Sequence, residues 1–380
     1  MNKNKGITLI ALVITIIILL ILSGISISAL TNQGLFKNAK TAQNATEKAE
    51  KEQGQRLNEY EDEINKYLNN ANEDEKIGLI TDNINKELSK TDNTKLKDEK
   101  GNRIVVPAGF KIVNGATTVD KGIVIEDVTE TATKGSQFVW IPVGTIIKSD
   151  GTTATITLGR YGFDATTGKE SAYSDTYVEE DSNDSSTLKK CGNTIAKNIT
   201  KFKNSVATNG GYYIGRYEAR TATARSAAGN ALTQITEKGT ENVYNYVTQL
   251  QAAQLSQNMY NNDNFTSDLM NSYAWDTATV FIQNCGTNAK YSRQISLNTS
   301  LLQTGTNSLT DTSKIDVQCN IYDMASNILE WTTETTDSSS FPCVYRGGFY
   351  GNSDHYTSCR DGNSTSDSNV IVGFRPLLYL

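Results

Sequence analysis

A long uncharged segment near the N-terminus constrains this chain more than any other feature. No charged residue occurs from Gly6 to Phe36, and the part from Ile7 to Leu22 is almost entirely β-branched residues and leucine. Such a run suits a membrane-spanning helix, which needs roughly 20 apolar residues. Lys3 and Lys5 precede it, which favours a cytoplasmic N-terminus and the rest of the chain outside. The sequence therefore predicts a single-pass cell-membrane protein with a transmembrane helix over 7–30 and its head outside the cell.

The residues before this run suggest how it is processed. The stretch Lys5-Gly6-Ile7-Thr8-Leu9-Ile10 resembles the leader of type IV pilins, which a prepilin peptidase cuts after the glycine before methylating the new N-terminus. The resemblance implies a leader over 1–6, cleavage after Gly6, methylation of Ile7, and self-assembly with other pilin subunits. Ala11 stands where pilins usually carry a glutamate, so whether the subunits polymerise stays open. A plain signal anchor is the alternative.

The segment from 31 to 100 is predicted to form a stalk and a junction. Leu57, Tyr60 and Ile64 recur at three- and four-residue steps, and Glu and Lys fill the other faces, as in a solvated helix. Residues 31–70 are therefore predicted to continue the helix out of the membrane. Residues 69–100, with a weaker helical pattern, are predicted to join this stalk to the head.

Composition excludes several classes of function. The 36 basic and 42 acidic residues form no basic cluster, which argues against a nucleic-acid partner. A single histidine, His355, excludes a histidine-rich metal site. The cysteines show no C-x-x-C spacing, which argues against zinc, and their disulfide pairing cannot be read from the sequence. They are Cys191, Cys285, Cys319, Cys343 and Cys359.

Three short motifs follow one another between Tyr322 and Leu380. Large apolar residues stand out there in polar sequence and are predicted to be core anchors, while a Gly-Gly pair allows a backbone conformation or a close approach that a side chain would block. The motifs consist of Asn327, Glu330, Trp331 and Thr332; of Arg346, Gly347, Gly348 and Tyr350; and of Gly373, Phe374 and Arg375.

These motifs resemble N-x-W-E-W-T, R-G-G-S-(W/Y) and G-F-R of the formylglycine-generating-enzyme (sulfatase-modifying) domain, a variant of the C-type lectin fold. Weaker matches extend the resemblance towards residue 104. It implies an α+β fold: a transmembrane and stalk helix, then a loop-rich C-type-lectin-like head over 101–380 with a polar insertion at 145–209. Helices are expected within the head over 246–255 and 269–282.

The resemblance departs from the family at the catalytic cysteines. Formylglycine generators use a copper-binding cysteine pair, separated by four residues, in the segment after R-G-G-S-Y. The corresponding positions hold Asn352 and Thr357, and Cys359 lies two residues off without a partner at the right spacing. A thiolate pair binds the copper and performs the oxidation. We therefore expect no enzyme activity and no bound copper.

The same resemblance implies a calcium site. In the family one Ca²⁺ is held around the N-x-W-E-W block, and carboxylate and carbonyl oxygens are the ligands that this ion prefers. An alternative is that Glu330 instead pairs with Arg346 or caps a turn. The positions carried over are Asp323, the carbonyls of Ser326 and Ile328, and Glu330.

The segment from Phe349 to Val372 is predicted to bind a ligand. It interleaves aromatic residues with small polar ones, which offer large contact area at low entropy cost and adaptable hydrogen bonding. It also resembles the variable region of diversity-generating-retroelement receptors, and Lys, Glu, Gln, Met and Trp are absent between Val344 and Gly373. The expected ligand-binding residues are Phe349, Tyr350, Asn352, Ser353, Asp354, His355, Tyr356, Ser358, Asp361 and Asn363.

The sequence analysis thus predicts a pilin-like cell-surface protein whose head binds an extracellular protein or glycan. Two alternatives stay open: a minor pilin or pseudopilin of a type IV pilus or type II secretion system without a specific ligand, and an enzyme of the formylglycine-generating kind.

Overall fold

The computed structural model divides into two units, 1–76 and 77–380, and each is considered by itself. The leader residues Gly6 and Ile7 and most of the predicted stalk lie outside the residues that the structure describes. Those residues are 12–24, 40, 44–46, 48–49, 53, 77–81, 83–113, 115, 117–179, 181, 198–302 and 316–380.

The fold class predicted for the N-terminal part was wrong. The described part of the apolar run, residues 12–24, is helical. Among the described residues, no helix combines the length and the apolar character that membrane crossing requires.

The second unit is mostly β-sheet, which also corrects the expected loop-rich α+β head. Its central sheet has six antiparallel strands in the order β14-β21-β11-β6-β5-β4. The last strand of the chain lies inside this sheet, between β14 and β11, so the C-terminal residues are part of the core. The strands are β4 (Phe110–Ile112), β5 (Val124–Asp127), β6 (Gln137–Pro142), β11 (Gly211–Gly215), β14 (Thr266–Leu269) and β21 (Pro376–Tyr379).

The predicted junction belongs to this compact unit, which begins at Ile77. Its described residues form no α-helix, and Ile80 and Ile84 are buried in the core of the unit. A three-stranded sheet is built here, in which β1 and β2 are parallel and β2 and β3 antiparallel. The elements are β1 (Gly78–Leu79), η1 (Ile84–Lys86), β2 (Thr94–Lys97), β3 (Arg103–Val106) and, further along the chain, η2 (Val119–Lys121).

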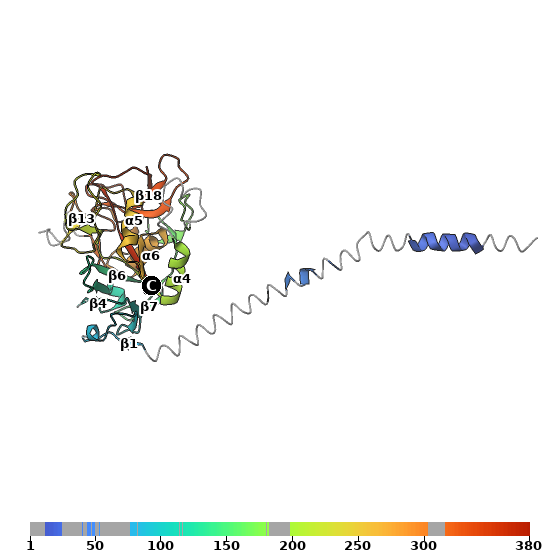
Figure 1. Cartoon of the computed structure of the whole chain (residues 1–380), viewed down its shortest axis with the longest axis horizontal. Coiled ribbons are helices and arrows are strands. Elements are labelled where there is room, and N and C mark those ends of the chain that lie inside the picture. Colours follow the sequence, from blue (N-terminus) through green and yellow to red (C-terminus); the bar gives the residue numbers. More distant parts are fainter. Residues whose placement is uncertain are drawn as a thin grey trace, which may run out of the picture. The chain divides into compact units, whose positions relative to one another are not determined.

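Two of the three α-helices described in 77–380 lie between two sheets. Helix α5 (Gln249–Met259) contacts β14 and β17 (Leu329–Thr335), and helix α6 (Ser272–Cys285) contacts β6 and β17 (Figure 1). Each begins three residues later than predicted, because the side chain of a Thr or Asn caps its first turn. Helix α4 (Ile199–Asn209) ends at a left-handed glycine and packs its Phe202 ring against Tyr212 and Tyr379.

The second sheet carries the C-terminal motifs. Its strand order is β19-β18-β17-β20, with β17 and β20 parallel and the other pairs antiparallel. In this register Glu330 lies between Arg346 and Gly373, and Trp331 lies between Tyr345 and Phe374. Three motifs separated in the sequence thus become neighbours across three strands. The remaining strands are β18 (Cys343–Arg346), β19 (Arg360–Asn363) and β20 (Val372–Phe374).

The described part of the polar insertion is ordered into hairpins. Asx-type hydrogen bonds close their turns: the Asp150 and Asp164 carboxylates accept backbone N–H groups of the following threonines. Residues 182–197 of the insertion lie outside the described part.

The two-stranded pairs of the unit are β7 (Gly144–Ile147) with β8 (Thr153–Ile156), β9 (Tyr161–Phe163) with β10 (Glu170–Ala172), β12 (Arg220–Thr221) with β13 (Asn242–Val243), and β15 (Val317–Gln318) with β16 (Ile321–Tyr322).

Candidate functional site

The Gly-Gly pair carries the chain from the buried sheet to the surface. Gly347 has a φ of +83°, and a Cβ there would lie 2.7 Å from the Met324 carbonyl oxygen. A Cβ at Gly348 would lie 2.4 Å from the Ala325 carbonyl oxygen. Only glycine permits this passage. The chain therefore passes tightly over residues 324–325 before it emerges at Phe349.

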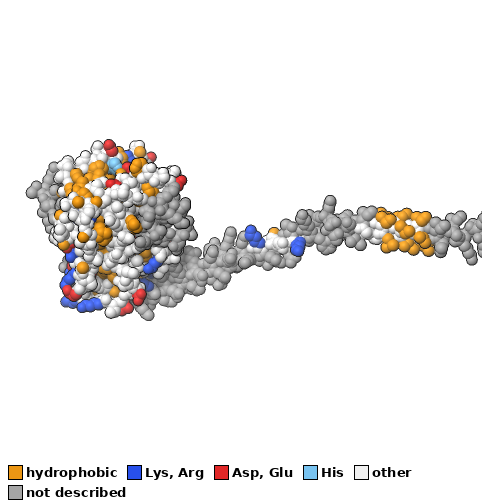
Figure 2. Space-filling view, turned by 45° about the horizontal axis from the view of Figure 1, so that its top comes forward, with side chains coloured by type: hydrophobic (Ala, Val, Ile, Leu, Met, Phe, Trp, Pro, Cys, Tyr) orange, Lys and Arg blue, Asp and Glu red, His pale blue; other side chains and the backbone are white. Residues whose placement is uncertain are grey.

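A group of aromatic rings follows immediately. The His355 ring lies 5.5 Å from the Phe349 ring and 6.4 Å from the Tyr345 ring, between centroids. Phe349 also meets Tyr350 edge to face at 6.4 Å. Phe349, Tyr350 and His355 are half-buried, so each presents part of its ring to solvent. Figure 2 shows the histidine side chain at the surface beside hydrophobic and acidic side chains.

Asn352 shapes the turn around this ring group. Its Oδ1 accepts the backbone N–H groups of Asp354 at 2.7 Å and His355 at 2.9 Å, and lies 3.2 Å from His355 Nδ1. On the other side of the ring, His355 Nε2 lies 3.8 Å from Asp361 Oδ2, which accepts the Tyr345 hydroxyl proton. The imidazole is thus held between an amide and a carboxylate.

A second segment, which the sequence analysis missed, lies beside these residues. The Arg293 guanidinium stacks on the Tyr356 ring at 3.6 Å from its centroid. Thr357 N–H donates to the Gln294 carbonyl and Ser358 N–H donates to the Ser292 carbonyl, each at 3.0 Å. Arg293 belongs to η3 (Tyr291–Arg293). No local sequence signal links η3 to the C-terminal motifs, because the two segments meet only through tertiary contacts.

Residues 298 and 327 continue this contact. Gly351 N–H donates to the Asn298 carbonyl, and Tyr350 N–H donates to the Asn327 carbonyl, both at 2.9 Å. Asn327 has a φ of +65°, and its amide donates to Glu218 at 2.5 Å while its Oδ1 accepts the Leu302 N–H at 2.8 Å. An asparagine suits this motif position because it tolerates the left-handed region. We call residues 291–299 and 349–363 together the loop surface.

The predicted ligand-binding residues all lie on the loop surface, but with different accessibility. Ser353, Asp354 and Asp361 are exposed, and the other seven are half-buried. Thr357, in the middle of the segment, is buried, and its carbonyl accepts the indole N–H of Trp275 at 2.8 Å. Buried residues of this kind fix the loop, and the exposed ones are available to a partner.

A buried ion-pair network supports this surface from below. Arg346 donates to Asp276 at 2.6 Å and to Glu334 at 3.3 Å, and Arg360 donates to the same two carboxylates. Arg160, from the polar insertion, also pairs with Glu334. Burial alone would raise the pKa of Glu334, but the three guanidinium groups outweigh it and hold that pKa below its ordinary value. The network ties the insertion to β17, β18 and β19.

The calcium ligands predicted from the resemblance are brought together, but they do not fit calcium binding through Glu330. Both carboxylate oxygens of Glu330 accept hydrogen bonds from Arg375, at 3.0 and 2.6 Å. The partner is thus Arg375 instead of Arg346, and a cation would compete with that guanidinium. The described residues contain no group of three His, Cys, Asp or Glu side chains placed to hold a metal ion.

The buried centre around Asp323 holds more acids than arginines. Asp323 Oδ1 is buried without a hydrogen-bond partner, and burial together with the charge of Asp316 raises the pKa of Asp323 to about 7. Burial raises the pKa of Asp316 to about 6, although Ala325 N–H and the Tyr291 hydroxyl donate to it. Burial also raises the pKa of Glu218 and of Glu237 well above the ordinary value. Arg220 and Arg375 lower these pKa values only in part.

The cysteine positions offer no thiol pair for oxidation chemistry on the loop surface. Asn352 and Thr357 occupy the corresponding places, and Thr357 is buried. Cys359 is half-buried, and burial raises the pKa of its thiol. Cys285, Cys319, Cys343 and Cys359 form no disulfide with one another.

Comparisons with known proteins give limited likenesses. No protein-family model matches the chain, and no curated protein matches it. Among solved structures, "Treponema denticola variable protein 1" is 14% identical, with 66% of this chain and 98% of that chain covered and a TM-score of 0.33. "CarF" is 15% identical, with 36% of this chain and 67% of that chain covered and a TM-score of 0.27. Likenesses at such low TM-scores do not establish a shared fold.

Proposed function

We propose that residues 77–380 form a ligand-binding head of the C-type-lectin kind, and that its loop surface binds a protein or glycan outside the cell. The observation that carries this proposal is the ring group of Phe349, Tyr350 and His355 beside the stacked pair of Arg293 and Tyr356. These rings are half-exposed and fixed from behind by buried hydrogen bonds. Rigid aromatic residues among small polar side chains provide contact area at low entropy cost.

The support beneath this surface favours recognition by a preformed site. The left-handed Gly347, the Asn352 turn and the ion pairs of Arg346 and Arg360 hold the loop backbone before any ligand arrives. A surface already held in its binding conformation loses less entropy on association.

The test compares binding by the full chain with binding by two double variants. The probes are a glycan array and wells coated with mucin, fibronectin or collagen. We expect that a probe bound by the natural chain is no longer bound by the double variant Tyr350→Ala/Tyr356→Ala. The control, Lys203→Ala/Tyr273→Ala, removes a cation–aromatic pair at 3.9 Å elsewhere in the unit and should keep binding. Equal binding by both variants would contradict the proposal.

A more specific form of this proposal is that a diversity-generating retroelement varies the C-terminal segment of the loop surface. It rests on the absence of Lys, Glu, Gln, Met and Trp between Val344 and Gly373, which are residue types that such variation does not produce. We expect the encoding genome to hold a near-copy of this stretch beside a reverse-transcriptase gene. A complete genome without such a copy would remove this form and leave the binding proposal intact.

Formylglycine generation is the competing function, and the residues at 352 and 357 argue against it. We expect no oxygen-dependent conversion of a Cys-x-Pro-x-Arg peptide by the copper-treated chain, because both thiolates of the pair are missing. Mass spectrometry of the peptide measures this directly, and detected turnover would favour the enzyme.

The prepilin-like leader gives the proposal its cellular setting, since cleavage after Gly6 belongs to exported pilin-like proteins. Mass spectrometry of the mature N-terminus should find a methylated Ile7. An intact Met1 would contradict processing without affecting the head.

A further inference from the structure

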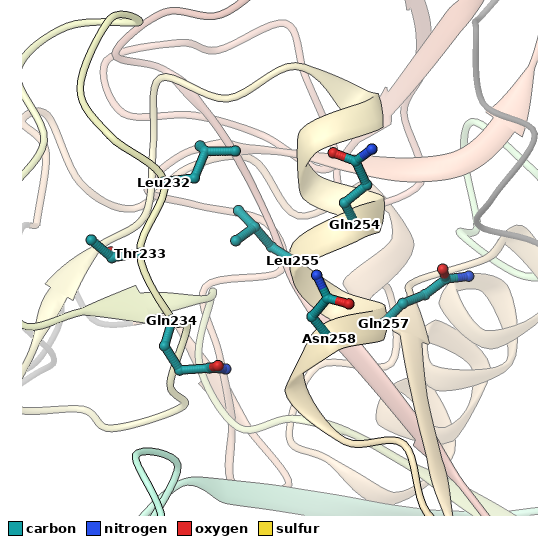
Figure 3. Close-up of a pocket in the computed structure, with 7 residues that line it drawn as sticks. All are labelled: Leu232, Thr233, Gln234, Gln254, Leu255, Gln257 and Asn258. Atoms are coloured by element: carbon teal, nitrogen blue, oxygen red, sulfur yellow. The ribbon is translucent and has the colours of Figure 1, made fainter.

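A second concave surface lies apart from the loop surface, between helix α5 and the segment 231–235. It has a volume of about 510 Å³. Figure 3 shows Leu232 and Leu255 pointing towards one another across it, with Gln234, Gln254 and Asn258 around them. None of its lining residues belongs to the loop surface.

The side chains of this groove are polar but uncharged. Four of the lining residues are Gln or Asn, one is Thr233, and the other two are leucines. No basic residue lines it to attract phosphate, and no aromatic residue lines it for a sugar ring or a base to stack on. Amide groups both donate and accept hydrogen bonds, which matches the alternating donors and acceptors of a peptide backbone. The chemistry therefore favours an uncharged peptide.

The backbone of the segment adds a direct reason for a peptide. Thr233 turns both of its backbone groups to the Tyr244 hydroxyl: its N–H lies 2.9 Å away and its carbonyl 3.3 Å away. In an extended segment the neighbouring residues turn their groups to the opposite side. Within the described part of the chain, no backbone–backbone hydrogen bond involves Leu232 or Gln234. These two residues lie outside any strand, and their backbone groups offer donors and acceptors to a partner strand.

The segment is also held firmly. Arg225 Nε donates to the Asn245 carbonyl at 2.7 Å, and its Nη1 donates to the Ala231 carbonyl at 2.9 Å. The guanidinium lies 4.8 Å from the centroid of the buried Tyr244 ring. Because this clamp fixes the segment in advance, a partner strand would lose little binding free energy to ordering it.

We propose that this groove binds a short, extended, uncharged peptide segment of a partner protein, which pairs with the backbone of Leu232 and Gln234. The peptide adds one strand at this edge, as in other cases of strand addition. An apolar side chain of the peptide would lie between Leu232 and Leu255, and the surrounding amides would bond its backbone. The site is separate from the proposed ligand surface, so either can fail without the other.

Hydrogen exchange of the full chain, followed by mass spectrometry, tests this proposal. The probe is acetyl-Thr-Gln-Leu-Thr-Asn-Thr-amide at millimolar concentration. We expect slower exchange at the amides of Leu232 and Gln234 and no change on the loop surface. The same peptide methylated at its central backbone nitrogens should bind about tenfold more weakly, because it has lost pairing hydrogen bonds.

Two variants and a second probe sharpen the outcome. Leu255→Glu places a charge in the groove and should abolish protection, whereas Leu79→Glu, at a residue that is 54% exposed and does not line the groove, should keep it. Unchanged exchange with the peptide would overturn the proposal. Equal protection by the methylated peptide, or protection by maltotriose alone, would overturn it too.

Discussion

At single positions of this chain, backbone geometry restricts the residue type as much as side-chain contacts do. Gly347 stands at a positive φ against a carbonyl oxygen, and Asn327 holds a left-handed turn while its side chain bonds in two directions. The sequence already predicted, for the Gly-Gly pair, a backbone conformation or close approach that a side chain would block. The position of both residues in the structure gives them a structural task, which is to bring the loop surface out of a buried sheet.

We predict that Gly347→Ala destabilises the protein by about 2 kcal/mol or more, because the new Cβ meets the Met324 oxygen at 2.7 Å and the backbone stays left-handed. Gly229→Ala is the matched control, since no atom lies within 4 Å of its Cβ and its φ is ordinary. It should change stability by less than about 0.5 kcal/mol. Urea unfolding measures both, and an equal effect would refute the geometric explanation.

At the scale of elements, ion pairs add to the hydrogen bonds between neighbouring strands and also join β17 directly to β19, which is not its neighbour in the sheet. The Glu334 carboxylate at the end of β17 receives Arg346 from β18, Arg360 from β19 and Arg160 from the insertion. Removing one partner from such a buried network leaves other charges unpaired, which is more costly than losing an exposed pair.

We predict that Glu334→Gln destabilises the protein by about 3–5 kcal/mol, with the loss expressed in the β18–β19 region. Glu130→Gln is the control, because Glu130 pairs with Lys134 at 2.5 Å on the exposed surface and such pairs contribute about 0–1 kcal/mol. Chemical denaturation gives both free energies. Hydrogen exchange should show the β18 and β19 amides opening first in Glu334→Gln, and uniform opening would contradict the local role.

At the scale of the whole molecule, the buried excess of acids should make stability depend on pH. The folded-state pKa values of Asp316 and Asp323 are raised to about 6 and about 7, whereas an unfolded Asp titrates near 3.9. The folded state therefore prefers the protonated form. Stability from this source is complete below about pH 4 and is lost as pH rises through 6 and 7.

We predict that the free energy of unfolding rises by on the order of 4 kcal/mol when pH falls from 8 to 5. Asp323→Asn should flatten this dependence, and asparagine tolerates the φ of +63° at that position. The control is Asp150→Asn, because hydrogen bonds from Thr152 lower the pKa of that acid and place its titration outside this window. Stability that instead falls between pH 8 and 5 would refute the assignment.

The sequence by itself determined several features of this protein. The fully buried Trp331 and Phe374 are the core anchors that their isolation in polar sequence indicated. Helices α5 and α6 were located because local capping and periodicity depend on neighbouring residues. The same local information predicted a membrane-spanning helix, but no helix among the described residues is long and apolar enough to cross a membrane.

Only the tertiary structure decided which partners meet. Arg293 reaches Tyr356, Arg160 reaches Glu334, and Glu330 pairs with Arg375 instead of Arg346, all across segments far apart in the sequence. Burial then shifted the pKa values of the buried acids. The pKa of Asp323, for example, depends on neighbouring residues that no local sequence pattern indicates. Strand register and burial are properties of the assembled sheets. For that reason the contribution of residues 291–299 to the loop surface, and the α5 groove, became visible only in the folded chain.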